Sequence, residues 1–209
     1  MRLLLEALAA EPDPHTTVSS PAEAMDVHVA DSLSGLEVES LARARQIADV
    51  GAGAGFPGLV LAIALPRARV DLIESAGRKT AVIGRLAQAA QISNANAVTA
   101  RAEEWATLPR AYDAVVARAV AALPVLVEYA APLLREDGVL VAWKGARSES
   151  EEAAGVAAAA IVGLELDRVL RVEPFEGARD RHLHVYRKIS PTPERFPRRA
   201  GMAVKRPLA

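Results

Sequence analysis

A glycine-rich turn constrains the fold of this 209-residue chain more than any other feature of its sequence. Gly51, Gly53 and Gly55 follow directly on the short apolar run 46–50. Glycine has no Cβ, so a turn built from it bends tightly and lets its backbone approach a ligand closely. We predict a strand over 46–50 that enters a ligand-binding turn, and a helix over 57–66 that leaves it.

The rest of the chain alternates strand patterns with helix patterns. The elements expected after residue 66 are strand 70–74, helix 78–92, strands 96–99 and 113–117, helix 123–134, strand 139–143, helix 151–162, and strands 164–172 and 182–189. The last two strands have no helix between them and are expected to pair as an antiparallel hairpin. This order predicts an α/β fold: a doubly wound, mostly parallel, seven-stranded Rossmann-like sheet with an antiparallel edge strand.

Helices also precede this sheet. Residues 1–45 are predicted to form an N-terminal helical extension. Its second helix begins at Ser20, a capping residue, with a proline next and Glu23 at the third position after the cap. Residues 46–190 then form the main domain and residues 191–209 a basic tail. The helices expected in the extension cover residues 1–10, 20–30 and 33–45.

The C-terminal tail carries most of the charge asymmetry of the chain. From Arg187 onward there are seven basic residues and a single acidic one, Glu194. Such a segment can neutralise phosphates and support RNA binding; the alternative is a solvated, partly disordered tail. The net charge of the whole chain, −1, favours neither.

The composition excludes several kinds of chemistry. The chain has no cysteine, so disulfides, iron–sulfur clusters and attack by a thiolate are ruled out. No apolar run approaches the roughly 20 residues that span a bilayer, and the N-terminus is charged too soon for a signal peptide. His182 and His184 lack a third ligand nearby, so no metal is expected. We expect a soluble, cytoplasmic, monomeric protein with no membrane association.

Acidic and basic residues at the ends of other predicted strands sharpen the ligand prediction. Glu74 ends the second strand, where a carboxylate can bind both hydroxyls of a ribose. The glycine spacing alone also fits a dinucleotide fingerprint, or a tight turn without a ligand. The segment 101–105, after the third strand, can read an adenine edge with an acceptor side chain and its backbone, and Arg118 faces the same crevice after the fourth. These positions favour S-adenosylmethionine over a nicotinamide cofactor.

Further motifs are spread over nearly all of residues 20–209. They read HVADSL (28–33), DVGAGAGFPGLVLAIALP (49–66), LIESAGRKTAVI (72–83), NANAVTARAEEW (94–105), DAVVARA (113–119), LVAWKG (140–145), RHLHVYRK (181–188) and TPERFPRRAG (192–201). In these stretches the chain resembles the bacterial glucose-inhibited-division protein B family, the small-subunit ribosomal RNA methyltransferase G enzymes. The resemblance implies a methyltransferase-type sheet and methylation of a guanine N7 in 16S ribosomal RNA, free or in the small ribosomal subunit.

The resemblance also implies which residues form the site. On the cofactor side these are Gly51, Gly53, Gly55, Phe56, Glu74, Ala102, Glu103 and Arg118. On the RNA side they are His28, Asp31, Ser32, Lys144, Arg181, Arg198 and Arg199. N7 of guanine keeps a free lone pair, so it can attack the sulfonium methyl directly and needs no general base. Arg118 and Lys144 are the predicted catalytic residues, because a cation donates well to guanine O6.

Other interpretations stay open at this stage. The enzyme can instead methylate a small molecule or a protein, although the basic tail argues against this. A nicotinamide-dependent oxidoreductase lacks support, since no Tyr-x-x-x-Lys pair is present. Phe56, Trp105 and Trp143 are either stacking partners for a base or parts of the core.

Overall fold

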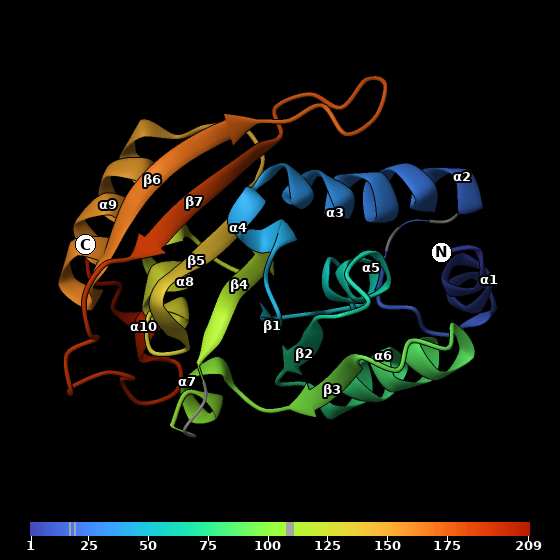
Figure 1. Ribbon diagram of the computed structural model, residues 1–209, viewed down its shortest axis with the longest axis horizontal. Coiled ribbons are helices and arrows are strands. Elements are labelled where there is room, and N and C mark those ends of the chain that lie inside the picture. The colour runs from blue at the N-terminus through green and yellow to red at the C-terminus, as the bar shows by residue number, and fades with distance from the viewer. Residues whose placement is uncertain (17, 19, 108–110) are drawn as a thin grey trace.

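The computed structural model describes residues 1–16, 18, 20–107 and 111–209 (Figure 1). Its centre is a seven-stranded sheet with the strand order β3-β2-β1-β4-β5-β7-β6. Strands β1 to β5 pair in parallel, and β7 pairs antiparallel with both β5 and β6. The strands are β1 Gln46–Val50, β2 Arg69–Glu74, β3 Ala95–Thr99, β4 Tyr112–Arg118, β5 Leu134–Lys144, β6 Leu164–Arg171 and β7 His182–Lys188.

The predicted α/β class and the mostly parallel sheet are confirmed, with one difference in placement. The antiparallel strand is β7, which lies second from the edge, and β6 forms the edge itself. A short connection makes β6 and β7 antiparallel neighbours, as predicted, but β7 is the one that pairs with β5. As a result β6 runs in the same direction as the five parallel strands.

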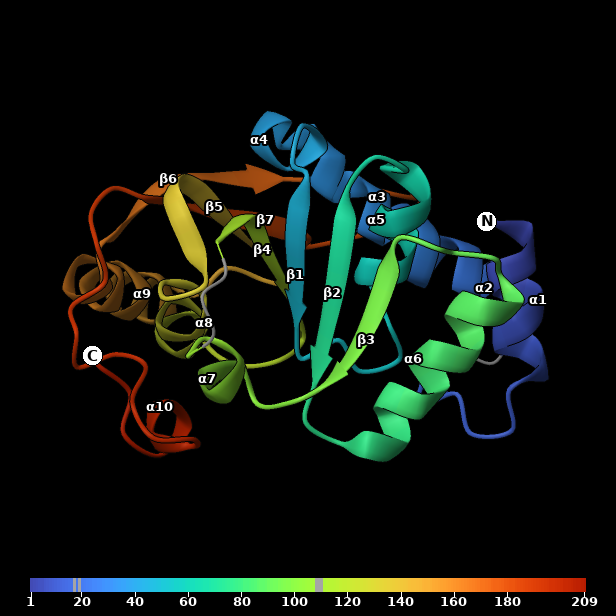
Figure 2. The same cartoon turned by 60° about the horizontal axis from the view of Figure 1, so that its bottom comes forward.

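Helices cover both faces of the sheet (Figures 1 and 2). Successive residues of a strand point to opposite faces, so Val115 joins one apolar core and Val116 the other. The core around Val116 packs against α1, α5, α6 and the helical segment after residue 20, whereas that around Val115 packs against α7, α8, α9 and the C-terminal segment. These helices are α1 Arg2–Ala10, α5 Gly58–Ala64, α6 Gly77–Ala89, α7 Ala102–Trp105, α8 Leu123–Ala130, α9 Glu149–Val162 and α10 Met202–Lys205.

The helical extension differs from its prediction in where it breaks. The Ser20 cap is confirmed, because the Ser20 hydroxyl accepts the N–H of Glu23 at 3.1 Å. The helical segment passes Ala30 without ending, since no proline or glycine follows until Gly35. It then continues as a 3₁₀ helix to Glu37. The break is at Val38, which is extended, so the predicted helix over 33–45 is wrong. The segments are α2 Pro21–Ala24, the π-helix η1 Met25–Ala30, α3 Asp31–Leu33, the 3₁₀ helix η2 Ser34–Glu37 and α4 Glu39–Ala42.

Helix α8 is shorter than predicted and β5 is longer. The helix ends at Ala130 and the strand begins at Leu134, which pairs with Tyr112. The Asp137-Gly138 turn predicted to start the strand is a bend inside it, where Asp137 has φ +61°. A Cβ on Gly138 would lie 2.9 Å from the carbonyl oxygen of Arg135, so only glycine fits this bend.

The C-terminal segment packs on the sheet domain. Phe196 and Ala203 are buried, and Arg198 binds the carboxylate of Glu128 on α8 with two hydrogen bonds of 2.7 and 2.6 Å. The N-terminal helix α1 likewise buries Leu4 in the core beside α6. Among the described residues, no helix is long and apolar enough to cross a membrane.

Candidate active site

Three adjoining clefts follow the carboxyl edge of the parallel strands. Strand β1 lies between β2, the next strand in the chain, and β4. The strand order therefore reverses between β1 and β4, and open α/β sheets bind ligands at such a topological switch point. The central cleft, about 420 Å³, is lined by the glycine turn and by Glu74, His28 and Arg118. The side cleft, about 140 Å³, is lined by Glu74, Ala102 and Glu103 among others. The outer cleft, about 390 Å³, is lined by His28, Asp31, Arg118, Lys144 and Arg181 together with Val27, Ala119, Trp143 and Gly145.

The glycine turn forms one wall of the central cleft. Gly53 has φ +57°. Apart from its chain neighbours, a Cβ built on it would have, among the described residues, only the carbonyl oxygen of Gly51 within 4 Å, at 3.8 Å. Its N–H donates to Glu74 Oε2 at 3.1 Å, and the N–H of Ala76 donates to Glu74 Oε1 at 2.9 Å. The turn and the end of β2 therefore hold one carboxylate at the junction of the central and side clefts.

Asp49, the residue two positions before Gly51, helps to fix the shape of the turn, a role that was not predicted from the sequence. Its side chain is buried, and Oδ2 accepts the N–H of Gly58 at 2.7 Å. A Cβ on Gly58 would lie 2.6 Å from the same oxygen, so glycine is required there. Burial raises the pKa of Asp49 to about 7. Its position just before the glycine turn, in the DVGAGAG motif, is the sequence signal that could have identified it.

Replacing Asp49 with asparagine is expected to change how stability depends on pH. Between about pH 4 and pH 7 the unfolded chain releases this proton while the folded chain keeps it, because the folded pKa is about 7. The contribution of Asp49 to the free energy of unfolding therefore falls across this window by up to about 4 kcal/mol and is constant above it. Urea unfolding at pH 4.5, 5.5, 6.5 and 7.5 should show a smaller fall for the variant. The exposed Asp26→Asn should keep the wild-type slope; equal slopes for all three proteins would contradict the prediction.

The side cleft includes the predicted adenine-reading positions. Ala102 lines it, and Glu103 is buried beside it. The Glu103 carboxylate also accepts the N–H of Gly201 at 2.7 Å, from the C-terminal segment. The wall of this cleft thus depends on residues almost 100 positions later in the chain.

Arg118 separates the central cleft from the outer one and lines both. Its Nη1 donates to Asp31 Oδ2 at 2.7 Å and to the carbonyl oxygen of Val27 at 3.0 Å. His28 Nδ1 lies 3.4 Å from Arg118 Nη2, and the His28 ring stacks on Phe56 with 4.3 Å between centroids. Burial, with the nearby Arg118 charge, lowers the pKa of His28 to about 4, so the ring is neutral at pH 7. Arg118 therefore contacts the side chains of both His28 and Asp31.

Two further cations complete the outer cleft. Lys144 Nζ lies 2.6 Å from Glu151 Oε1 and 3.3 Å from the carbonyl oxygen of Ala121. Arg181 Nε lies 3.7 Å from Asp31 Oδ1. The outer cleft thus receives three cations, from the last residue of β4, the last residue of β5 and the residue just before β7.

Not all predicted RNA-side residues gather there. Ser32 is fully buried and its hydroxyl donates to the carbonyl of His28, so it lines none of the three clefts. Arg198 is held by Glu128, Arg199 is exposed, and neither lines the three clefts. Trp143 is buried and donates its indole N–H to the backbone carbonyl of Asp31 at 2.8 Å, which makes it a support for the cleft.

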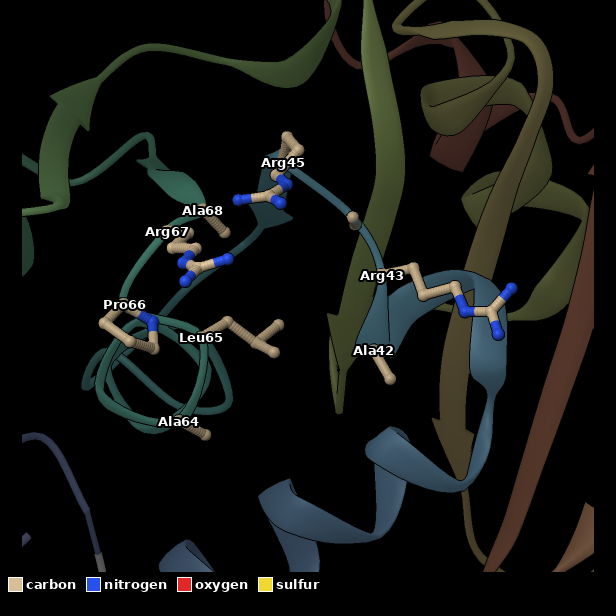
Figure 3. Close-up of a pocket in the computed structure, with 9 residues that line it drawn as sticks. Ala42, Arg43, Arg45, Ala64, Leu65, Pro66, Arg67 and Ala68 are labelled. Carbon is tan, nitrogen blue, oxygen red and sulfur yellow. The ribbon is translucent and has the colours of Figure 1, made fainter.

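A larger cavity, about 530 Å³, lies at the opposite edge of the sheet. Figure 3 shows its wall, which combines the end of α4 with the segment after α5. None of the predicted site residues lines it. Its lining residues are Ala42, Arg43, Ala44, Arg45, Ala64, Leu65, Pro66, Arg67 and Ala68.

The sheet order, the open glycine turn and the carboxylate at the end of β2 define the class of S-adenosylmethionine-dependent methyltransferases. Residues 15–183 match the family model described as GidB, rRNA small subunit methyltransferase G, so the chain belongs to that family. The curated relative from Rubrobacter xylanophilus, named ribosomal RNA small subunit methyltransferase G, is 47% identical over 188 residues, covering 87% of this chain and 72% of the relative. The relative of the same name from Bacillus subtilis is 35% identical over 197 residues, covering 92% and 82%.

Solved structures support the fold. Aeropyrum pernix fibrillarin, in complex with natively bound S-adenosyl-L-methionine, superposes with a TM-score of 0.59 at 20% identity, covering 75% of this chain and 72% of that one. A putative methyltransferase from Thermoplasma acidophilum gives 0.55 at 17% identity, covering 70% and 69%. The residues present fit the cofactor: Gly53 leaves open space beside the turn, and Glu74 presents a carboxylate to the same cleft.

Proposed function

We propose that the protein transfers a methyl group from S-adenosylmethionine to N7 of a guanine in 16S ribosomal RNA. The observation that carries this is the junction of the central and outer clefts, which share His28, Arg118 and Ala119. A cofactor along the glycine turn and a base in the outer cleft would meet there. The substrate is the RNA, free or in the small ribosomal subunit, and the enzyme acts as a cytoplasmic monomer.

The reaction needs alignment more than acid–base chemistry. The bound cofactor supplies an electrophilic methyl group on a positively charged sulfur. N7 of guanine carries an in-plane lone pair and no proton, so direct displacement requires no general base. The protein's contribution is to place N7 in line with the methyl group and to exclude water. Neutral His28, stacked on Phe56, forms an uncharged aromatic wall suited to that task.

Binding roles follow from the positions of the charged groups. Glu74 accepts hydrogen bonds from the ribose hydroxyls of the cofactor. Arg118 and Lys144 donate toward O6 of the base, the acceptor next to N7. The guanine must be unpaired or flipped out of its helix to enter the cleft, at a cost of a few kcal/mol.

The test is methyl transfer to a defined RNA. Small subunits and naked 16S ribosomal RNA from a strain without this protein are incubated with the enzyme and radiolabelled S-adenosylmethionine. The modified nucleoside is then identified by mass spectrometry and its position by chemical cleavage at N7-methylguanine. A single labelled guanine is expected. Label in a protein, in a small molecule or in a different nucleoside would refute the proposal.

Glu74→Gln is expected to weaken S-adenosylmethionine binding by about 10- to 100-fold, because charge-assisted hydrogen bonds contribute about 1.5–3 kcal/mol. Glutamine keeps an oxygen for the Ala76 N–H and loses the acceptor for the Gly53 N–H. The loss of one hydrogen bond in the turn should leave the fold intact. Calorimetric titration measures the affinity directly. Glu136→Gln, an exposed change on β5, is the matched control and should bind as the wild type does. Equal affinities for both variants would exclude Glu74 from the cofactor site.

A further inference from the structure

Among the described residues, only one of the two carboxylate oxygens of Asp31 accepts a hydrogen bond. Its side chain is 9% exposed, and Oδ2 receives the hydrogen bond from Arg118. Oδ1 has no hydrogen-bond partner among the described residues. Arg181 Nε faces it at 3.7 Å and is itself without a hydrogen-bond partner there. Both atoms belong to residues that line the outer cleft.

The ion pair leaves both atoms without a hydrogen bond among the described residues. A donor and an acceptor 3.7 Å apart do not form a hydrogen bond, and a buried polar atom without a partner loses the hydration it had in water. The backbone of Asp31 is nevertheless fixed, since its carbonyl oxygen accepts the hydroxyl of Ser34 at 2.7 Å and the indole N–H of Trp143 at 2.8 Å. Oδ1 is thus a positioned acceptor, and the Arg181 side chain, 40% exposed, can move away from it.

We infer that Asp31 Oδ1 accepts a hydrogen bond from the Watson–Crick edge of the target guanine, at N1–H or the 2-amino group, and so selects guanine over adenine. This inference rests on the proposed function. Along the rim of guanine the order is N7, then O6, then N1–H and the amino group. Along the clefts the order is the glycine turn, then the Arg118 guanidinium, then Asp31. The clefts therefore present a methyl donor, a hydrogen-bond donor and a hydrogen-bond acceptor in the spatial order that guanine requires.

Adenine would meet the opposite pattern at each position. Its 6-amino group would point a donor at Arg118, and its N1 lone pair would face the Asp31 carboxylate. Two buried groups would then be unpaired or repelled, which is the kind of mismatch that gives strong discrimination between substrates. Asp31 is in this account a specificity-determining residue that touches the base.

The rival role for Asp31 is purely structural, as the counter-ion that holds Arg118. A double-mutant cycle that combines a substitution in the protein with a change in the target base separates the two roles. Once the modified guanine is mapped, the same RNA fragment is prepared by ligation with guanosine, inosine or 1-methylguanosine at that position. Inosine lacks the 2-amino group and 1-methylguanosine lacks N1–H, but both keep N7 and O6. Methyl transfer to each RNA is measured for the wild type, Asp31→Ala and Asp26→Ala.

In the wild type, at least one of the two analogues should lower kcat/KM about 10-fold or more, the size expected for a hydrogen bond to a charged group. The penalty should disappear in Asp31→Ala and persist in Asp26→Ala, whose side chain is exposed on η1. If Asp31→Ala is too slow to assay, the same cycle is measured with dissociation constants of the RNAs. A penalty that is absent from the wild type, or unchanged in Asp31→Ala, overturns the inference. A wild type that methylates no guanine RNA instead overturns the proposed function.

Discussion

Gly53→Asp is expected to abolish S-adenosylmethionine binding, with an affinity loss of more than about 100-fold, while the protein still folds. Aspartate is among the few residues that tolerate the left-handed backbone conformation at Gly53, where φ is +57°. Its side chain would nevertheless occupy the open side of the turn and bring a second negative charge beside Glu74. Titration calorimetry measures the affinity, and circular dichroism verifies the fold.

Gly84→Ala is the matched control for this change. Gly84 lies on α6, and a Cβ there would meet no atom within 4 Å from the described residues outside its own stretch of helix. Alanine should keep cofactor affinity and stabilise the helix by up to about 1 kcal/mol. Wild-type affinity in Gly53→Asp would mean that the cofactor does not lie along the glycine turn.

Arg198→Ala is expected to lower the free energy of unfolding by about 3 kcal/mol, because it leaves the Glu128 carboxylate buried without a counter-ion. The Glu128 side chain is 2% exposed and receives two short hydrogen bonds from the guanidinium. Urea unfolding at pH 7 gives this difference from the transition midpoint and slope. The result would establish Arg198 as a structural residue, apart from any contact that it makes with RNA.

The neighbouring Arg199 provides the comparison. It is exposed, and Arg199→Ala should change stability by no more than about 0.5 kcal/mol. RNA affinity measured on both variants completes the test. A loss of affinity in Arg199→Ala without a loss of stability would support its predicted place on the RNA side. If Arg198→Ala were as stable as the wild type, the ion pair with Glu128 would contribute nothing to folding.

The sequence predicted what depends on local pattern. The strand over 46–50, the turn after it and Glu74 at the end of β2 all follow from neighbouring residues, and the structure places them as expected. Where a helix or strand ends was harder to predict. The end of α8 is set by the pairing of Leu134 with Tyr112, a residue on another strand.

Contacts between distant residues could not be predicted from local pattern. Arg198 and Glu128 are 70 positions apart, and only the packed structure shows that they pair. Arg118 was expected in the crevice, but its ion pair with Asp31 joins β4 to a helix 87 positions earlier. Ser32 belongs to the same motif as His28 and Asp31, which line the outer cleft, yet its place on the helix turns its hydroxyl toward the backbone.

The contact between Gly201 and Glu103 has a consequence for how the enzyme is made. Glu103 stands in the wall of the side cleft, and its partner belongs to a segment that the ribosome synthesises after the whole sheet. During translation the hydrogen bond that holds Glu103 can form only after Gly201 has been added, later than every strand of the sheet. The last residues of the chain to be synthesised thus complete a contact in the wall of the cleft that its earlier residues form.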